Sequence, residues 1–441
     1  MQSKLKDKSF KSSQYNFFIK YDKNTMLAFN GVSKAIGKFS SEQYTVIKKI
    51  LAQPDEAVFS LRDGMKIKHY LLNNGFVIPY ENDEFKILKQ RNIDGIQSFE
   101  SMNLILLPTL DCNFNCFYCY EDHSSIKMNA DVLARIKNWG AQTLPKYRSL
   151  NLSWFGGEPL LEKNIIIELS QFFHDLCKKY HMGFYNMITT NGYLLNSEMI
   201  RSLCNIGINI FNITLDGPQY WHNKFRTHQN KNDSFEKITK GIISLATSFP
   251  KVRINVRVNY NNKNFNAIPE LFEFFPNKIR GQIFFLFREI FGMNTNKLCL
   301  TDENNESEYY KMAYQKGYGL SLGESLCGPK ETYCYADKKG SFVINPVGDV
   351  FKCSVCKFSS DSRMGFLSKD GKIIWDDEYL SKWNRINGFD DPECRICKYL
   401  PLCMGGCRAL RLEKKIFDNC TQPFEHIEQF VKQSYDRKKF L

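Results

Sequence analysis

Fifteen cysteines in a chain of 441 residues constrain this protein more than any other feature of its sequence. The first residues include several basic ones but no apolar segment behind them, so we expect no signal peptide. No run approaches the ~18 consecutive apolar residues of a membrane span. We therefore expect a cytoplasmic protein without a membrane partner, whose thiols stay reduced. Cysteines in such a protein indicate metal or cluster ligation rather than disulfides.

The chain carries 60 Lys and Arg against 47 Asp and Glu, a formal net charge of +13. Basic residues are spread along the sequence, and no block is longer than short pieces such as Arg437-Lys438-Lys439. Such a spread is typical of a solvated surface, so we expect no nucleic acid partner. Hydrophobic residues make up 43% and charged residues 24%, as in a soluble globular protein of two or three domains.

Residues 1–95 have the pattern of a small module that binds rather than catalyses. Strand-like runs at 15–20 and 26–30 precede predicted helices at about 41–51 and 62–72, and a short strand follows at 75–79. This order is winged-helix-like. The module contains no cysteine and no evident catalytic cluster.

The middle of the chain alternates strands and helices and predicts an α/β fold. Apolar runs at 104–110, 150–155, 184–190, 208–215, 252–259 and 282–287 are separated by stretches of helical periodicity. Six such units favour a parallel sheet, either an open barrel or a doubly wound sheet. Polar motifs follow these runs, at the carboxyl ends where barrels of this kind carry their chemistry. We assign 96–315 to this barrel, 316–425 to a separate cysteine-rich domain and 426–441 to a C-terminal helix or tail.

The first chemical motif is a loop with the spacing C-x3-C-x2-C directly after a strand, formed by Cys112, Cys116 and Cys119. Three thiolates on one loop can hold three irons of a [4Fe–4S] cube and leave the fourth iron open. The alternative is a zinc site, for which three cysteines lack a fourth ligand.

This loop, with Tyr118 before its last cysteine, resembles the signature of the radical S-adenosylmethionine (SAM) superfamily. The resemblance implies a partial (β/α)6 barrel and an open iron that chelates the methionine part of SAM. It also implies reductive cleavage of SAM to a 5′-deoxyadenosyl radical. Gly156-Gly157-Glu158-Pro159 resembles the GGEP segment of the family. There the glycines let the backbone approach the amino group, and the Glu158 carboxylate pairs with it. The alternative is a turn that opens a helix.

Further cofactor contacts are implied by resemblance to sulfatase-maturase-like members of the superfamily. Thr190 and Asn191 end the third strand, and Thr214, Asp216 and Arg226 match an S-x-D-G-P…R segment that lies near the ribose and carboxylate of SAM. Asn-Gly and Asp-Gly-Pro are also common turns. The predicted cofactor-binding residues are therefore Tyr118, Gly156, Gly157, Glu158, Thr190, Asn191, Thr214, Asp216 and Arg226.

The C-terminal cysteines have the spacing of the auxiliary domain called SPASM, found in radical SAM enzymes that modify ribosomal peptides and proteins. The resemblance implies two more [4Fe–4S] clusters, three in all. One would be ligated by Cys327, Cys334, Cys353 and Cys407, and the other by Cys394, Cys397, Cys403 and Cys420. Cys403 and Cys407 would lie one helical turn apart and point to different clusters. The alternative is a pair of zinc ribbons. Of the remaining cysteines, Cys177 and Cys204 read as buried apolar residues, and Cys356 is a candidate for chemistry.

The favoured function is a peptide maturase that abstracts hydrogen from a ribosomal precursor peptide and forms a thioether or carbon–carbon bond. Residues 1–95 would bind the leader peptide, for instance as an added strand. A flavodoxin or ferredoxin would supply electrons. The runner-up is a formylglycine-forming anaerobic sulfatase maturase, in which an aspartate that acts as base follows the cysteine where this chain has Ser354. A third possibility, a non-enzymatic iron–sulfur carrier, predicts no SAM cleavage.

Overall fold

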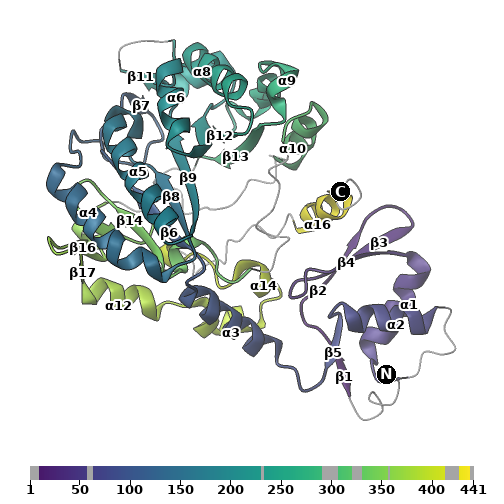
Figure 1. The fold of residues 1–441 in the computed structure, drawn as a ribbon. Helices are drawn as coiled ribbons and strands as arrows, with labels where there is room; N and C mark the ends of the chain where they lie inside the picture. Colours follow the sequence, from purple (N-terminus) through teal and green to yellow (C-terminus); the bar gives the residue numbers. More distant parts are fainter. Residues whose placement is uncertain are drawn as a thin grey trace.

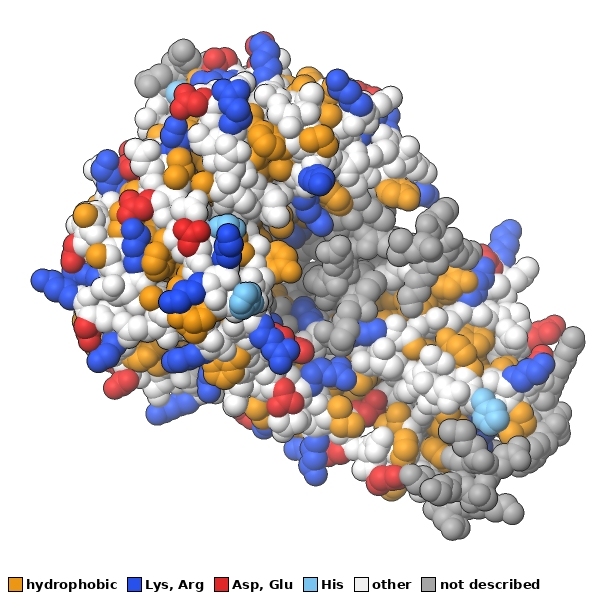
Figure 2. All heavy atoms as spheres, viewed as in Figure 1, with side chains coloured by type: hydrophobic (Ala, Val, Ile, Leu, Met, Phe, Trp, Pro, Cys, Tyr) orange, Lys and Arg blue, Asp and Glu red, His pale blue; other side chains and the backbone are white. Residues whose placement is uncertain are grey.

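A computed structural model describes residues 9–56, 63–229, 233–290, 306–319, 330–355, 358–412 and 427–437 of the chain. Figure 1 shows a large lobe, built from the middle and C-terminal parts, beside a smaller N-terminal module. In the described residues, no helix is both long and apolar enough to cross a bilayer. On the face drawn in Figure 2, Lys and Arg side chains are scattered among acidic and neutral ones and form no single basic patch.

The N-terminal module is a three-stranded antiparallel sheet with helices on one side. Its sheet has the order β2-β3-β4, and β1 pairs separately with β5. Helix α1 begins with a capping box in which Ser40 and Gln43 each bond the other's backbone N–H. The elements are β1 (Phe10–Ser12), β2 (Asn16–Lys20), β3 (Thr25–Asn30), β4 (Ile36–Ser40), α1 (Ser41–Ala52), α2 (Gly64–Asn73), β5 (Val77–Pro79) and α3 (Glu84–Gln97).

Both faces of this small sheet are buried. Ala28 and Phe39 pack with residues of α1 and α2, whereas Phe17 and Leu27 on the other face contact Leu402 and the C-terminal helix α16 (Ile427–Arg437). Figure 1 shows α16 beside β3. The module is thus fixed to the C-terminal part of the chain through apolar contacts.

Six parallel strands form the centre of the large lobe, in the spatial order β6-β8-β9-β10-β12-β13, which is also their order in the sequence. Their outward apolar side chains lie in one extensive core with the covering helices. This confirms the predicted partial (β/α)6 barrel. The strands are β6 (Met102–Leu106), β8 (Ser149–Trp154), β9 (Gly183–Thr190), β10 (Ile208–Thr214), β12 (Arg253–Tyr260) and β13 (Ile283–Glu289). The helices are α4 (Ala130–Thr143), α5 (Lys163–Lys179), α6 (Ser197–Asn205), α7 (Gln219–Phe225), α8 (Ser234–Ser248), α9 (Asn277–Arg280) and α10 (Glu306–Gln315), with η4 (Phe265–Glu273) after β12.

The cysteine-rich region shares this sheet. Strand β14 (Ser341–Ile344) pairs in parallel with β6, and β15 (Asp349–Phe351), β16 (Gly365–Leu367) and β17 (Ile373–Trp375) continue the same sheet as antiparallel strands. The region that we expected to be a separate domain therefore extends the barrel through backbone hydrogen bonds. Its helices are α12 (Asp377–Arg385), α13 (Pro392–Ile396), α14 (Leu400–Cys403) and α15 (Arg408–Leu412).

Candidate functional site

The loop with Cys112, Cys116 and Cys119 is held at the carboxyl end of β6 by a two-stranded ribbon. Strand β7 (Phe114–Cys116) pairs with β11 (Arg226–His228), which places Cys116 opposite Arg226. Just beyond β11, the Gln229 side chain donates a hydrogen bond of 2.9 Å to the carbonyl of Cys112. Gln229 and Cys112 are 117 residues apart in the sequence. A distant segment therefore anchors the loop at Cys112 and at Cys116.

The three thiols have the donor chemistry of an iron–sulfur site. Cys112 is buried and the other two are half-buried. Burial raises the pKa of Cys112 to about 12, and it also raises the pKa values of Cys116 and Cys119. The charge of Cys116 contributes to the raised pKa of Cys112, and that of Cys119 contributes to the raised pKa of Cys116. Buried thiols become thiolates when a cation compensates the charge, which is what ligation to iron supplies. In the residues described, no three His, Cys, Asp or Glu side chains converge around a single-ion site.

The GGEP segment packs directly against the residues that lead into Cys112. Gly156 has a φ of +116°, and a Cβ there would lie 2.4 Å from the carbonyl oxygen of Thr109. A Cβ on Gly157 would lie 2.1 Å from the carbonyl oxygen of Asp111. Neither position admits a side chain. The glycines thus bring the segment against the protein's own cluster loop, a role that the sequence alone did not suggest.

Glu158 has a different environment from the one we expected. Its side chain is fully buried, and its carboxylate accepts hydrogen bonds from the Leu160 N–H (2.9 Å), the Thr190 hydroxyl (2.7 Å) and the Asn191 N–H (2.7 Å). Burial raises its pKa, and these three donors oppose that shift. This carboxylate joins the loops after β8 and β9. Its pairing with the ammonium of SAM stays a prediction.

Asn191 extends this network to the cluster loop. Its side-chain amide donates to the side-chain oxygen of Asn113 at 2.7 Å, and its own oxygen accepts from the Tyr193 N–H at 2.9 Å. Thr190, Asn191 and Glu158 therefore lie together beside the cysteine loop, as the sequence predicted for residues of one site.

A second network surrounds Asp216, which is fully buried at the end of β10. The Tyr118 hydroxyl donates to its carboxylate, and Arg226 donates to the same hydroxyl at 2.7 Å. Asp216 also forms an ion pair of 3.9 Å with Arg226. Burial alone would lower the pKa of Arg226, but Cys116, Tyr118 and Asp216 raise it well above its usual value. The arginine is therefore a fixed cation beside the cluster loop.

Asn259, at the end of β12, belongs to this network although we did not predict it. Its N–H donates to Asp216 at 2.8 Å, and its amide donates to the Tyr118 hydroxyl at 3.1 Å. Its position at the carboxyl end of the fifth predicted strand was the signal that could have identified it. Thr214 is buried in β10, and no side-chain hydrogen bond joins it to the network among the described residues.

The C-terminal cysteines fall into neighbouring groups. Burial raises the pKa of Cys334 to about 12, and the charges of Cys407 and Cys353 contribute in the same direction. Cys394 and Cys397 are in and just after α13, and Cys403 ends α14. Arg411 donates to the Cys394 sulfur at 3.0 Å. Of the remaining predicted ligands, Cys327 and Cys420 lie outside the described residues, as does Cys356.

The turn between Cys403 and Cys407 differs from our expectation. Met404, Gly405 and Gly406 have φ values of +50°, +87° and +79°, so the chain makes a left-handed turn there and not a helical one. Gly405 packs on Gly388: a Cβ added to Gly405 would lie 2.8 Å from the Gly388 Cα. The backbone between the two cysteines is therefore left-handed, a conformation that glycine adopts easily.

The loop that carries Cys353 is joined by a hydrogen bond to Tyr120, the residue after Cys119. The Tyr120 hydroxyl donates to the carbonyl of Ser354 at 3.4 Å, and the Tyr335 and Ser354 hydroxyls are 2.8 Å apart. The Ser354 N–H also donates to Tyr335 at 2.8 Å. Two tyrosines that the sequence did not single out therefore connect the two cysteine regions.

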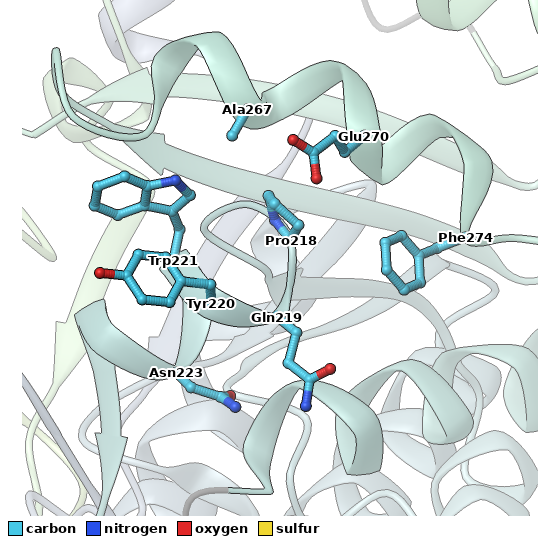
Figure 3. Close-up of a pocket in the computed structure, with 8 residues that line it drawn as sticks. All are labelled: Pro218, Gln219, Tyr220, Trp221, Asn223, Ala267, Glu270 and Phe274. Carbon is cyan, nitrogen blue, oxygen red and sulfur yellow. The ribbon is translucent and has the colours of Figure 1, made fainter.

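Figure 3 shows a pocket of about 750 Å³ outside the loop that follows Asp216. Its aromatic walls come from α7 and from the end of η4, with Tyr220 and Phe274 largely exposed. The lining residues are Pro218, Gln219, Tyr220, Trp221, Asn223, Ala267, Glu270 and Phe274. None of the predicted cofactor-binding residues lines it.

Comparisons with known proteins agree with this fold and loop. Residues 106–275 match the model of the radical SAM superfamily. The chain is 23% identical to a cysteine-type anaerobic sulfatase-maturating enzyme of Clostridium novyi, over 75% of this chain and 94% of that one. It is 22% identical to the radical SAM cyclopropyl synthase TigE of Paramaledivibacter caminithermalis, over 91% and 90% of the two chains.

Two solved structures have the same fold. The structure of anSMEcpe with AdoMet and the Cp18Cys peptide aligns with a TM-score of 0.53 at 17% identity, covering 76% of this chain and 99% of that one. The structure of Streptococcus suis SuiB with the precursor peptide SuiA aligns with a TM-score of 0.50 at 15% identity, covering 92% and 97%.

Proposed function

This chain is a radical SAM enzyme of the group that includes sulfatase maturases and peptide-modifying enzymes, and on that premise we propose that it modifies a ribosomally made precursor peptide. The observation that supports this most is the N-terminal module, fixed to the cysteine-rich region beside the partial barrel. The cyclopropyl synthase and the peptide-bound SuiB each align with more than nine-tenths of this chain, against about three-quarters for the sulfatase maturase.

We propose that Cys112, Cys116 and Cys119 ligate the catalytic [4Fe–4S] cluster. When bound, this cluster and SAM supply a 5′-deoxyadenosyl radical that abstracts hydrogen from the peptide. The chain's own residues position these groups. Glu158 fixes the loops that border the methionine part of SAM, and Arg226 offers a buried cation for its carboxylate.

Two auxiliary clusters complete the proposal. One is assigned to Cys327, Cys334, Cys353 and Cys407, and the other to Cys394, Cys397, Cys403 and Cys420. The electrostatic influence of Cys353 and Cys407 on Cys334 is in keeping with the first set, and the hydrogen bond from Arg411 to the Cys394 sulfur supports a thiolate there. Their role would be to accept the electron released when the new thioether or carbon–carbon bond forms. A flavodoxin or ferredoxin would reduce the catalytic cluster.

The leader peptide is assigned to the outer edge of β4. No described strand pairs with that edge, since the sheet ends there. The Ser41 N–H bonds to the Asn24 carbonyl and the Asn30 N–H to the Ala35 carbonyl, both at 3.0 Å. Because hydrogen-bonded pairs alternate along an antiparallel ladder, the N–H groups of Ile36 and Lys38 point away from β3. An extended peptide can add to such an edge.

A matched pair of variants tests this edge. Lys38→Pro removes the outward N–H, whereas Lys38→Ala removes the same ion pair with Asp22 and keeps the N–H. We expect leader binding, measured by anisotropy with the peptide encoded beside this gene, to weaken tenfold or more only in Lys38→Pro. Equal binding by the two variants would show that the leader does not add to β4.

The second candidate, formylglycine formation, is disfavoured by Ser354. Its hydroxyl bonds to Tyr335, so an alcohol and a phenol stand where the resemblance requires a carboxylate base. A sulfatase peptide tested beside the precursor peptide distinguishes the two. Our proposal would be refuted if mass spectrometry showed formylglycine in the sulfatase peptide while the precursor peptide stayed unmodified.

SAM cleavage distinguishes both enzymes from an iron–sulfur carrier. We expect the anaerobically reconstituted and reduced protein to release 5′-deoxyadenosine and methionine. The Cys112→Ala/Cys116→Ala/Cys119→Ala variant should release neither, and activity in that variant would exclude the assigned cluster.

A further inference from the structure

The inside of the barrel is lined by polar side chains. On β12 the residues Ile254, Val256, Val258 and Tyr260 are fully buried in the outer core, so the alternate residues face inward. Amide groups connect neighbouring strands on this inner face. Asn255 donates to Asn212 at 2.8 Å, and Asn212 donates to Thr189 at 3.2 Å.

Two arginines stand at the carboxyl end of this polar face. Arg257 lies two residues before Asn259 on β12, and Arg288 lies opposite Asn259 on β13, so all three share the inner face. Both arginines are exposed to solvent in the open barrel. Arg257 donates to the Asn259 side chain at 2.9 Å, and Arg288 donates to a backbone carbonyl at 2.7 Å.

In the part of the chain that the structure describes, neither Arg257 nor Arg288 forms an ion pair with an acidic side chain. Asp216 is the nearby carboxylate, but its oxygens are already bonded to Tyr118 and Asn259, and Arg226 is its ion-pair partner. The third inward arginine, Arg253, is stacked over the Phe284 ring at 4.0 Å, farther from this end.

The two cations also act on each other. Arg257 keeps solvent-exposed surface, but protein atoms surround its guanidinium; this loss of water and the charge of Arg288 lower its pKa, while Tyr120, Tyr118 and Asp216 act in the opposite direction. Arg257 is therefore near both the cluster loop and Tyr120, whose hydroxyl contacts the Cys353 loop. The Glu121 carboxyl also lies near Tyr120, and burial raises its pKa to about 7.

We propose that Arg257 and Arg288 bind a carboxylate of the substrate peptide, from an Asp or Glu side chain or from the peptide's C-terminus, and so place the neighbouring residue for hydrogen abstraction. This inference rests on the proposed function. Guanidinium groups bind carboxylates in two-pronged geometry, and a pair of them without an internal counter-ion favours an anionic ligand. Arg226 is buried and is assigned to the carboxylate of SAM. Arg257 and Arg288 are therefore available to bind the peptide.

The test measures binding without turnover. Three fluorescent probes are used with the full-length reconstituted enzyme in the presence of SAM: a C-terminally amidated Glu-Gly repeat, the matched amidated Gln-Gly repeat, and the Gln-Gly repeat with a free carboxylate. We expect one carboxylate probe to bind at least tenfold more tightly than amidated Gln-Gly. Arg257→Gln/Arg288→Gln should remove that preference, because two charge-assisted contacts are lost.

The control is Arg201→Gln/Arg385→Gln, which removes the same charge from exposed positions on α6 and α12. We expect it to keep the preference. The charge-reversed Arg257→Glu/Arg288→Glu enzyme should instead prefer a Lys-Gly repeat. SAM affinity, iron content and melting temperature are measured for each variant, which identifies a misfolded one.

Three results would overturn the inference: a preference that survives in Arg257→Gln/Arg288→Gln, a preference lost equally in the control, or a loss of SAM affinity with peptide preference intact. The last would assign the pair to the carboxylate of SAM. Because no turnover is measured, a carboxylate preference that depends on the pair would stand even if the precursor peptide were never modified.

Discussion

Replacing Glu158 tests whether this residue supports the site or contacts SAM. Glu158→Ala leaves three donors without an acceptor in a region closed to water: the N–H groups of Leu160 and Asn191 and the Thr190 hydroxyl. An orphaned buried donor costs about 1–3 kcal/mol, and the hydroxyl can turn to another acceptor. The two N–H groups alone therefore predict a loss of about 2–6 kcal/mol in the free energy of unfolding.

This loss is large against the ~5–15 kcal/mol total stability of a folded protein. For a chain of 441 residues the unfolding entropy corresponds to about 1 °C per kcal/mol, so we expect the melting temperature to fall by roughly 2–6 °C. Glu158→Gln keeps one acceptor oxygen but turns an N–H toward a donor, so its fall should be about half as large. Both are measured by calorimetry on the reconstituted enzyme, with SAM affinity measured beside it.

The matched control is Glu168→Ala on α5. Glu168 is exposed and pairs with Lys137 at 2.6 Å, a surface ion pair worth at most about 1 kcal/mol. The reasoning would be refuted if Glu158→Ala melted like this control and yet lost tenfold in SAM affinity. In that case the carboxylate would contact SAM directly, as we expected from the sequence.

Three further predictions follow from the same contacts. Reconstituted enzyme should hold near twelve irons by colorimetric assay. The Cys112→Ala/Cys116→Ala/Cys119→Ala variant should hold about four fewer, because one cube has four irons. Zinc in place of iron would contradict all three clusters. Tyr118→Phe removes the hydroxyl shared by Asp216, Arg226 and Asn259 and should cost about 1–3 kcal/mol in a thermal melt, whereas Tyr120→Phe, with its single 3.4 Å bond, should cost little. Deleting residues 1–95 uncovers the apolar surface at Leu402 and α16 and should increase binding of a hydrophobic dye; an unchanged dye signal would show that the contact is weak.

Much of the barrel could be predicted because its strands are apolar runs with helical stretches between them. All six predicted runs overlap the observed parallel strands. Strands β7 and β11 were missed because each has three residues, too few for a period to appear. Strand β4 was missed for a similar reason, since its five residues include a glycine and a lysine.

Contacts between distant segments could not be read from local patterns. The pairing of β14 with β6 joins residues 238 apart, as the hydrogen bond between Asn103 and Ser341 shows. Sequence resemblance gathered Tyr118, Asp216 and Arg226 around one cofactor, but it did not reveal that they bond to one another. For Glu158, the motif identified the carboxylate but not the direction in which it points, which depends on donors from the next strand.

The shared sheet also affects the distance over which electrons would pass between the two cysteine loops. Strand β6 leads to Cys112, and Cys353 follows β15, which is hydrogen-bonded to β6 through β14, so about 10 Å of continuous sheet separates the two strands. Tunnelling rates depend steeply on distance, and a hinge between two independent domains would make that distance fluctuate. Here a backbone ladder sets it, so the interval between the two loops should remain constant while the peptide binds and leaves.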